Sequence, residues 1–216
     1  MSDWIELSHP IEPDVARAGF LPAPRMSPID DASLRATELE MVTHVGTHLE
    51  APVHLVPDGA SIDEYDADRF VGHAVVHEVD ADPLEEVGLD RIRPAGERLE
   101  HGDALLLWTG WDEFVGEERY GDHPYLSEAA AEWVVERGVS WLGVDALSPE
   151  LPPQARPGGE FDYPVHSTLL ENDVLIAENL TNLGAVAGER VAINAVPLRL
   201  TGSDGSPARV LARPSE

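Results

Sequence analysis

The apolar residues of this chain come in short runs, and this pattern restricts the folds open to it. The longest run extends only from Ala104 to Trp108, far short of the roughly 20 residues that a membrane-spanning helix needs. Short runs bounded by glycine, proline or aspartate are typical of buried strands. The pattern predicts a sheet-rich α/β fold. The strands are expected within 37–43, 73–80, 104–109, 140–146, 174–177, 191–200 and 209–212.

Helix signals are fewer. The clearest covers Glu128 to Arg137, with Ser127 placed to cap its first turn and Gly138 placed to end it. Weaker helices are expected at 112–116 and from 179 through 183. The Pro- and Gly-rich stretches at 10–28 and 149–164 are expected to form long loops, which in a compact domain are often functional.

The composition limits the classes of function open to the chain. The 216 residues suit a single domain spanning 1–216, and 43% hydrophobic content supports a packed core. There are 14 basic residues, all arginine, against 41 acidic ones, a net charge of −27. That charge argues against nucleic acid and anionic membranes as partners. It suggests adaptation to high salt, where repulsion between like charges is screened. Two alternatives are an acidic protein from an arginine-favouring genome and a basic protein partner.

The termini and the cysteine count add two expectations. The first residues carry neither the basic nor the apolar region of a signal peptide, so we expect a cytoplasmic protein. Cysteine is absent, which excludes thiolate metal sites and a cysteine nucleophile. Any metal must therefore be held by nitrogen and oxygen.

Three histidines and a glutamate fall close together at His44, His48, Glu50 and His54. A straight strand would place them on one face, but its rise of about 3.3 Å per residue would spread them too far for one metal site. A shared site requires the chain to curl, and Gly46 and Pro52 favour a curled backbone. Imidazole with carboxylate is a common ligand mix for hydrolytic zinc. The alternative is a set of solvated surface histidines.

This segment, His-x-Gly-Thr-His-x-acid-x-Pro-x-His, resembles the signature of the cyclase-like metal-dependent hydrolases, a family that includes kynurenine formamidase (arylformamidase) and isatin hydrolase. The similarity continues in order along nearly the whole chain. The further matching segments are Trp108-Thr109-Gly110-Trp111, Gly143 to Ser148, His166 to Leu170 with Glu178-Asn179-Leu180, and Gly205 to Arg209.

The resemblance implies a swivelling β/β/α-like fold, a homodimer or homotetramer, and a site for one or two zinc ions, with manganese as the alternative. It gives His54 the role of proton donor and acceptor. It implies the metal ligands His44, His48, Glu50, His166 and Glu178, the two glutamates bridging the ions. Two departures stand out. The family's usual acid is aspartate where this chain has Glu50, and Phe20 is the aromatic residue of the loop in which the formamidases place a substrate-stacking tryptophan.

The expected activity is hydrolysis of an amide or formamide of a small molecule, with a formylkynurenine-type arylformamide as the leading substrate. A metal-activated water attacks the carbonyl, and His54 passes a proton to the leaving amine. Asp145 or Asn179 would orient ligands, with a turn residue and a cap as the alternative interpretations; the role of His123 is left open. The competing functions are hydrolysis of a cyclic amide or lactone, as in isatin, and metal binding without turnover.

Overall fold

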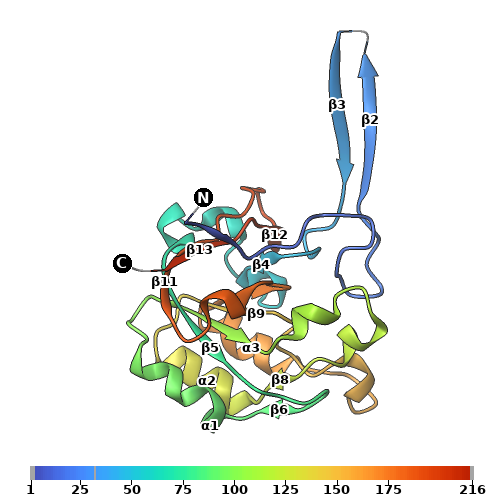
Figure 1. Ribbon diagram of the computed structural model, residues 1–216. Coiled ribbons are helices and arrows are strands. Elements are labelled where there is room, and N and C mark those ends of the chain that lie inside the picture. The colour runs from blue at the N-terminus through green and yellow to red at the C-terminus, as the bar shows by residue number, and fades with distance from the viewer. Residues whose placement is uncertain (1–2, 32, 215–216) are drawn as a thin grey trace.

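A nine-stranded mixed sheet that curls on itself forms the centre of the protein (Figure 1). The computed structural model describes residues 3–31 and 33–214. Four neighbouring strands are parallel, and each of the remaining strands pairs antiparallel with its neighbours. In sheet order the strands are β1 (Ile5–Glu6), β13 (Leu211–Pro214), β11 (Arg190–Asn194), β5 (Val71–Glu78), β7 (Ala104–Trp108), β9 (Trp141–Val144), β10 (Leu175–Glu178), β4 (His48–Glu50) and β12 (Gly205–Pro207).

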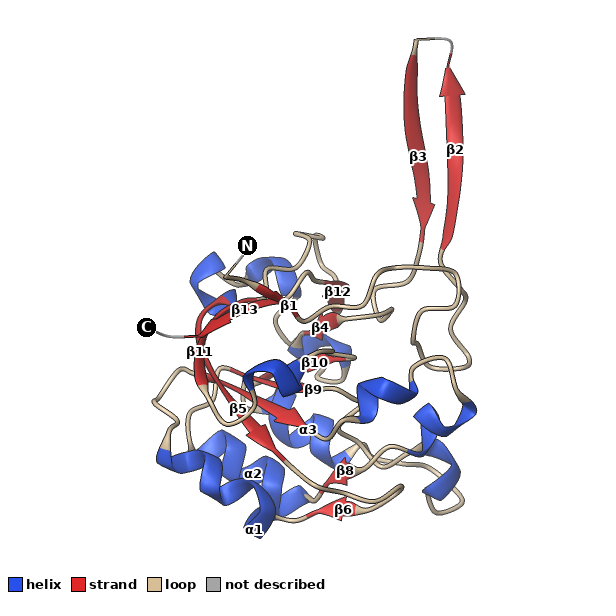
Figure 2. Ribbon diagram, viewed as in Figure 1, coloured by secondary structure: helices blue, strands red, loops and turns tan. Residues whose placement is uncertain are grey.

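The sheet buries both of its faces, as near-continuous apolar runs require. Side chains alternate along β7, where Leu105 and Leu107 pack toward the helices while Leu106 lies inside the curl. The helices cover one side of the sheet (Figure 2). They are α1 (Leu89–Ile92), α2 (Glu128–Glu136) and α3 (Pro164–Glu171).

The remaining elements are short. Strands β6 (Glu86–Val87) and β8 (Tyr125–Leu126) form a small parallel pair. The 3-10 helices are η1 (Pro52–His54), η2 (Ile62–Glu64), η3 (Ala67–Phe70), η4 (Arg93–Glu97), η5 (Trp111–Phe114), η6 (Glu118–Asp122), η7 (Pro153–Ala155) and η8 (Leu183–Val186). Within the described ranges, no helix is both long and apolar enough to cross a membrane.

The sequence predicts most strands of the main sheet and α2, but neither α1 nor α3. Six of the expected strand segments overlap strands of the main sheet, and the hydroxyl of Ser127 caps α2 by accepting a hydrogen bond from the amide of Ala130 at 3.2 Å. The two weaker helices are single 3-10 turns, η5 and η8.

Two loop predictions are partly wrong. The loop expected at 149–164 extends only to residue 163, because Pro164 is the first residue of α3. A proline is tolerated there, since the first amides of a helix have no hydrogen-bond partner within the helix. The loop expected at 10–28 gives way to β2 (Arg25–Asp31), which pairs with β3 (Leu34–Glu40). This hairpin includes the expected strand at 37–43. It projects from the body instead of joining the sheet (Figures 1 and 2).

Candidate metal centre

The segment from residue 44 to 54 curls, as its histidine spacing requires. Gly46 takes a left-handed conformation with φ +57, which favours glycine at this position. The chain then enters β4, where His48 and Glu50 lie two residues apart and so share a face. The turn η1 follows and carries His54 back toward the start of the segment, so that its ring lies 4.2 Å from that of His44.

Two other elements bring the distant ligands to β4. Strand β10 pairs with β4 antiparallel, and this register sets Glu178 opposite His48. Helix α3 packs behind β10 and carries His166, which is 5% exposed. The structure therefore brings together the predicted ligands His44, His48, Glu50, His166 and Glu178.

Glu50 lies at the middle of this group. Its Oε1 is 2.9 Å from Nδ1 of His44 and 3.5 Å from Nε2 of His48, while its Oε2 is 3.3 Å from Nε2 of His166. Glu178 faces the same rings, with Oε2 3.5 Å from Nε2 of His48 and Oε1 3.4 Å from Nε2 of His166. Both carboxylates are thus placed between histidine nitrogens, the arrangement that bridging ligands need.

Two buried polar atoms indicate that the group holds a cation. Nε2 of His48 and Oε2 of Glu50 are shielded from solvent and have no hydrogen-bond partner, which is costly for buried polar groups. In the groups His44–His48–Glu50 and Glu50–His166–Glu178, as in a third group of His44, His54 and Asp204, the atoms able to bind a metal lie within 4.8 Å of one another. Nitrogen and carboxylate oxygen suit a divalent ion such as zinc. The residues present therefore fit the metal that the sequence predicts.

The pKa shifts of the histidines in this group also favour a bound cation. Burial alone would lower the pKa of His166, but Glu50, Glu150 and Glu178 raise it well above its ordinary value. The pKa of His44 is raised to about 9, because hydrogen bonds and charge from Glu50 and Asp204 outweigh burial. Carboxylates thus dominate the site, and a bound cation would satisfy the same negative charge that otherwise attracts protons.

Backbone contacts orient His48. Its Nδ1–H donates to the carbonyl of Gly46 at 2.8 Å, which leaves Nε2 facing the two glutamates. Hydrogen bonding at the far nitrogen is the usual way in which a metal-binding histidine is held. Strand β12 closes over β4 from the other side, and a Cβ at Gly205 would lie only 2.6 Å from the carbonyl oxygen of Leu49. Glycine is therefore required at that position.

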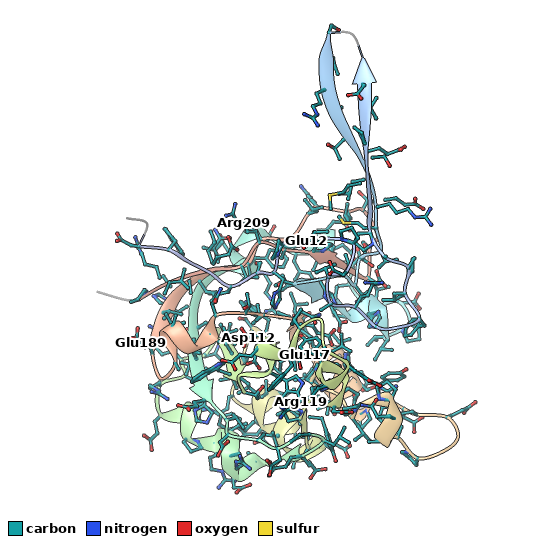
Figure 3. The ribbon with its side chains drawn as sticks, turned by 45° about the vertical axis from the view of Figure 1, so that its right-hand side comes forward. Glu12, Asp112, Glu117, Arg119, Glu189 and Arg209 are labelled. Carbon is teal, nitrogen blue, oxygen red and sulfur yellow. The ribbon has the colours of Figure 1, made fainter. Side chains whose placement is uncertain are left out.

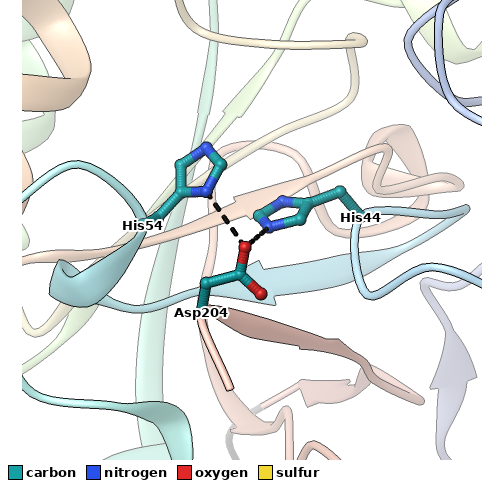
Figure 4. A group of neighbouring side chains, drawn as sticks. All are labelled: His44, His54 and Asp204. Atoms are coloured by element: carbon teal, nitrogen blue, oxygen red, sulfur yellow. Dashed lines mark hydrogen bonds and ion pairs between the residues drawn. The ribbon is translucent and has the colours of Figure 1, made fainter. Parts of the chain in front are cut away.

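Asp204 is a member of the site that sequence reasoning missed. Its Oδ2 is 2.9 Å from Nε2 of His44 and 3.4 Å from Nδ1 of His54 (Figure 4). Its Oδ1 accepts a hydrogen bond from the hydroxyl of Thr43 at 2.9 Å. Asp204 directly precedes the segment beginning at Gly205, and that adjacency is the one sequence signal that could have found it. It ties His54, whose side chain is 30% exposed, to the buried ligands.

Glu150 is the second residue that the sequence did not reveal. It is 1% exposed, and its Oε2 accepts hydrogen bonds from the backbone amides of Val165 and His166, each at 3.1 Å. The same oxygen lies 3.3 Å from Nδ1 of His166. A carboxylate near the start of α3 is favoured by the helix dipole. It also directs Nε2 of His166 toward Glu50 and Glu178.

Asp145 and Asn179, the residues predicted to orient ligands, are both buried and hydrogen-bonded. Asp145 accepts hydrogen bonds from the amides of Thr109, Gly110 and Trp111 and so holds the turn after β7. It is therefore the turn residue of the alternative interpretation. Asn179 accepts hydrogen bonds from Thr47 and Tyr120.

His123 is buried, and its Nδ1–H donates to the carbonyl of Pro124 at 3.0 Å. Among the described residues, none of the groups able to hold a metal includes it.

Comparisons with known proteins identify the family of this chain. A family model described as putative cyclase matches residues 5–151. Kynurenine formamidase of Bacillus cereus is 30% identical over 217 residues, covering 99% of this chain and 98% of that protein. Kynurenine formamidase of Bacillus mycoides is 31% identical over 218 residues, with the same shares covered.

Among solved structures, isatin hydrolase A from Labrenzia aggregata bound to benzyl benzoate is 25% identical, with a TM-score of 0.87 over 99% of this chain and 94% of that one. A potential metal-dependent hydrolase with cyclase activity is also 25% identical, with a TM-score of 0.81 over 99% of this chain and 98% of that one.

Proposed function

The chain belongs to the putative cyclase family and is a metal-dependent hydrolase, and from that premise we propose that it cleaves the formamide C–N bond of an N-formyl aryl amine such as formylkynurenine. The observation that carries the proposal is the pairing of a buried group of ligands with a half-exposed histidine at its rim. Support for this substrate class comes from the kynurenine formamidases, which match the chain from end to end.

The metal in this proposal is zinc, as one or two ions, with manganese as the alternative. The residues that would hold it are His44, His48, Glu50, His166 and Glu178. A divalent ion held there would lower the pKa of a water to about 7 and would polarise the carbonyl oxygen of the substrate. The extra methylene of Glu50, in place of the family's usual aspartate, lengthens its reach by about one bond, roughly 1.5 Å.

His54 supplies the proton transfer. Its side chain is the most exposed of the histidines at the site, so that it can reach both a substrate and the buried ligands. Asp204 contacts Nδ1 of His54 and thereby turns the opposite nitrogen, Nε2, outward. In that orientation Nε2 takes a proton from the attacking water and gives it to the leaving amine.

The test is a substrate panel on the full chain in high salt, with N-formyl aryl amines, isatin and small lactones. The proposal predicts the highest kcat/KM for the N-formyl aryl amines. It also predicts that His54→Ala keeps its bound metal and loses turnover by at least 100-fold, as expected when a general acid–base is removed. Unchanged turnover in that variant would overturn the role of His54.

Hydrolysis of a cyclic amide is the second candidate. The observation that favours it is the similarity in fold to isatin hydrolase A, at a TM-score of 0.87. Faster turnover of isatin than of any N-formyl aryl amine would establish it. Retained metal with no turnover of any substrate in the panel would instead indicate a family member that binds metal without catalysis.

The charge of the chain is the basis for proposing where the enzyme acts. A net charge of −27 with no lysine suits a cytoplasm rich in salt, where the Debye length falls to about 3 Å at 1 M. We further propose a homo-oligomer acting on a small-molecule substrate, without nucleic-acid or membrane partners.

A further inference from the structure

The loop at 149–163 holds an arginine against two aromatic rings. The Cζ atom of Arg156 lies 4.4 Å from the ring centroid of Phe161 and 4.7 Å from that of Tyr163. The two rings meet edge to face, with their centroids 5.2 Å apart. Cation–π attraction holds a guanidinium on aromatic rings without using its hydrogen-bond donors. These contacts therefore position Arg156 and leave its donors for another partner.

The terminal nitrogens of Arg156 have no protein partner among the residues that the structure describes. Its Nε donates to the carbonyl of Leu151 at 2.8 Å, and this is its one hydrogen bond to the described part of the chain. Glu160 and Asp162 lie in the same loop, yet neither forms an ion pair with Arg156. Two such nitrogens can bind a carboxylate through parallel hydrogen bonds.

Tyr163 connects this arginine to the metal centre. It directly precedes α3, and its ring lies edge to face with the ring of His166 at 6.2 Å. The ring of His54 lies 6.5 Å from the same His166 ring. Since Arg156 lies 4.7 Å from the centroid of Tyr163, its Cζ atom is no more than about 11 Å from the centre of the His166 ring. Arg156 is therefore within reach of a small molecule bound at the metal centre.

The backbone of Tyr163 is strained. Its φ is +49, a left-handed conformation that is rare and costly for a bulky residue. Glycine occupies two other positions of the loop, Gly158 and Gly159, but not this one. The chain thus keeps a partly exposed aromatic side chain where glycine would relieve the strain. Residues held in this way cluster at ligand sites.

We propose that Arg156 binds a carboxylate of the substrate while Tyr163 packs against the substrate's aryl ring. This inference rests on the proposed formamide hydrolysis and narrows its substrates to N-formyl aryl amines that carry an acidic side chain, such as formylkynurenine. An open pocket of about 690 Å³ is lined by Arg156, Phe161 and Tyr163 together with other residues of the loop. Seven bonds separate the formyl and carboxylate carbons of formylkynurenine, a span of up to about 9 Å, which suits the distance from His166 to Arg156.

The charge of the chain makes such a contact selective. With 41 acidic residues against 14 arginines, the surface repels an anionic group at long range. An acidic substrate therefore needs a cation at a fixed position, and Arg156 supplies a positive charge that no carboxylate of the described residues neutralises by direct pairing.

Arg119, labelled in Figure 3, is a matched control. Its Cζ atom lies 4.0 Å from the ring centroid of Phe114 and 5.5 Å from that of Trp111. Those two rings also meet edge to face at 5.2 Å, so the packing resembles that of Arg156. Within the described residues, neither ring contacts the ring of a metal-binding histidine. A variant of Arg119 thus removes a stacked arginine without touching the proposed carboxylate site.

Two ligands that differ by one carboxylate test the proposal. Kynurenine and kynuramine share the aminophenyl ketone and the amino group, and only kynurenine carries the carboxylate. Calorimetry on the zinc-loaded full chain gives both Kd values at one salt concentration. In Arg156→Gln we expect the ratio of the two Kd values to shift by about tenfold or more, through weaker binding of kynurenine alone. Arg119→Gln should keep the wild-type ratio, because the change in overall charge is the same.

Three results would overturn the proposal. An unchanged ratio in Arg156→Gln would mean that the arginine does not touch the carboxylate. An equal loss of both ligands would mean that Arg156 only supports the loop. An equal shift in Arg119→Gln would trace the effect to overall charge instead of position.

Turnover separates this inference from the proposed function. Kynurenine and kynuramine, each formylated at the aryl nitrogen, serve as substrates, and Arg156→Gln should lower kcat/KM about tenfold or more for the acidic one alone. A wild type that shows the expected binding but hydrolyses neither formamide would refute the formamidase proposal and still support Arg156 as a carboxylate site. Hydrolysis of both substrates with the same ratio of kcat/KM values in wild type and Arg156→Gln would refute the role of Arg156 alone.

Discussion

At the scale of single residues, some members of the site can be predicted from the sequence, and others are recognised only in the folded structure. The ligands at 44–54 and at His166 and Glu178 are predictable because they lie in contiguous motifs that resemble a known family. Asp204 and Glu150 are not, since each reaches the site from a distant part of the chain. With 41 acidic residues, spacing alone cannot single out two carboxylates.

Asp204→Asn tests the link between the buried ligands and His54. It removes a charge that contacts both His44 and His54, and loss of such an orienting partner typically costs 10- to 100-fold in activity or metal affinity. We expect a fall of that size in kcat with little change in thermal unfolding, because the Asp204 side chain is 42% exposed. Asp68→Asn, at an exposed acid away from the site, is the control. Equal kcat in the two variants would exclude an orienting role.

His123 makes folding stability depend on pH. Its burial lowers its pKa to about 4 from 6.5, so below pH 6.5 the unfolded chain binds a proton that the folded chain rejects. The stability is complete above pH 6.5 and is lost progressively as pH falls through 4, by on the order of 3 kcal/mol. Urea unfolding at pH 7.5 and 5 measures this loss. In His123→Gln the drop between the two pH values should shrink by one to two kcal/mol, and an unchanged drop would assign it to other groups.

At the scale of elements, the strands are the most predictable part of the fold and α3 is the least. The apolar runs of β5, β7, β9 and β10 are bounded by polar or turn residues and match the sheet. Helix α3 was not predicted, because the Pro- and Gly-rich stretch expected to form a loop runs to Pro164, which is the first residue of the helix. The first amides of α3 donate hydrogen bonds to Glu150. Because Glu150 lies in another segment, no sequence pattern within the helix predicts this contact.

Glu150 should therefore stabilise both α3 and the metal site. Glu150→Ala leaves two backbone amides and one ring nitrogen of α3 without their acceptor, which costs about 1–3 kcal/mol. We expect lower stability in urea together with weaker zinc retention on dialysis. Glu150→Gln keeps an acceptor oxygen for the amides and should recover most of the stability. If the alanine variant holds zinc as well as the wild type, Glu150 does not position His166.

At the scale of the whole molecule, the acidic composition and the site describe different properties. Of the acidic residues that the structure describes, Glu50, Glu178, Glu150 and Asp204 are the ones that form ion pairs with the histidines of the metal centre. The great majority of the other acids contribute to a surface field whose self-repulsion destabilises the compact chain. The β2–β3 hairpin is also a feature of the whole molecule. The pairing register of its strands could not be predicted, because neither face of the hairpin is buried in the body.

Salt should therefore stabilise the protein. Raising NaCl from 0.1 M to 2 M shortens the Debye length from about 10 Å to under 3 Å and screens the net charge of −27. We expect Tm to rise by about 5 °C or more, which for a chain of this size corresponds to one or two kcal/mol. Differential scanning calorimetry across the salt series gives the answer. A flat or falling Tm would contradict adaptation to salt.

The central claim is that the histidine–glutamate group is a catalytic metal centre, and a metal titration tests it most directly. The protein is stripped with a chelator, and hydrolysis of an N-formyl aryl amine is then followed as zinc or manganese is added back. The account predicts that the stripped protein is inactive, that activity returns in proportion to one or two bound ions per chain, and that Glu178→Ala neither binds the full complement nor recovers activity. Full activity in the stripped protein would contradict it.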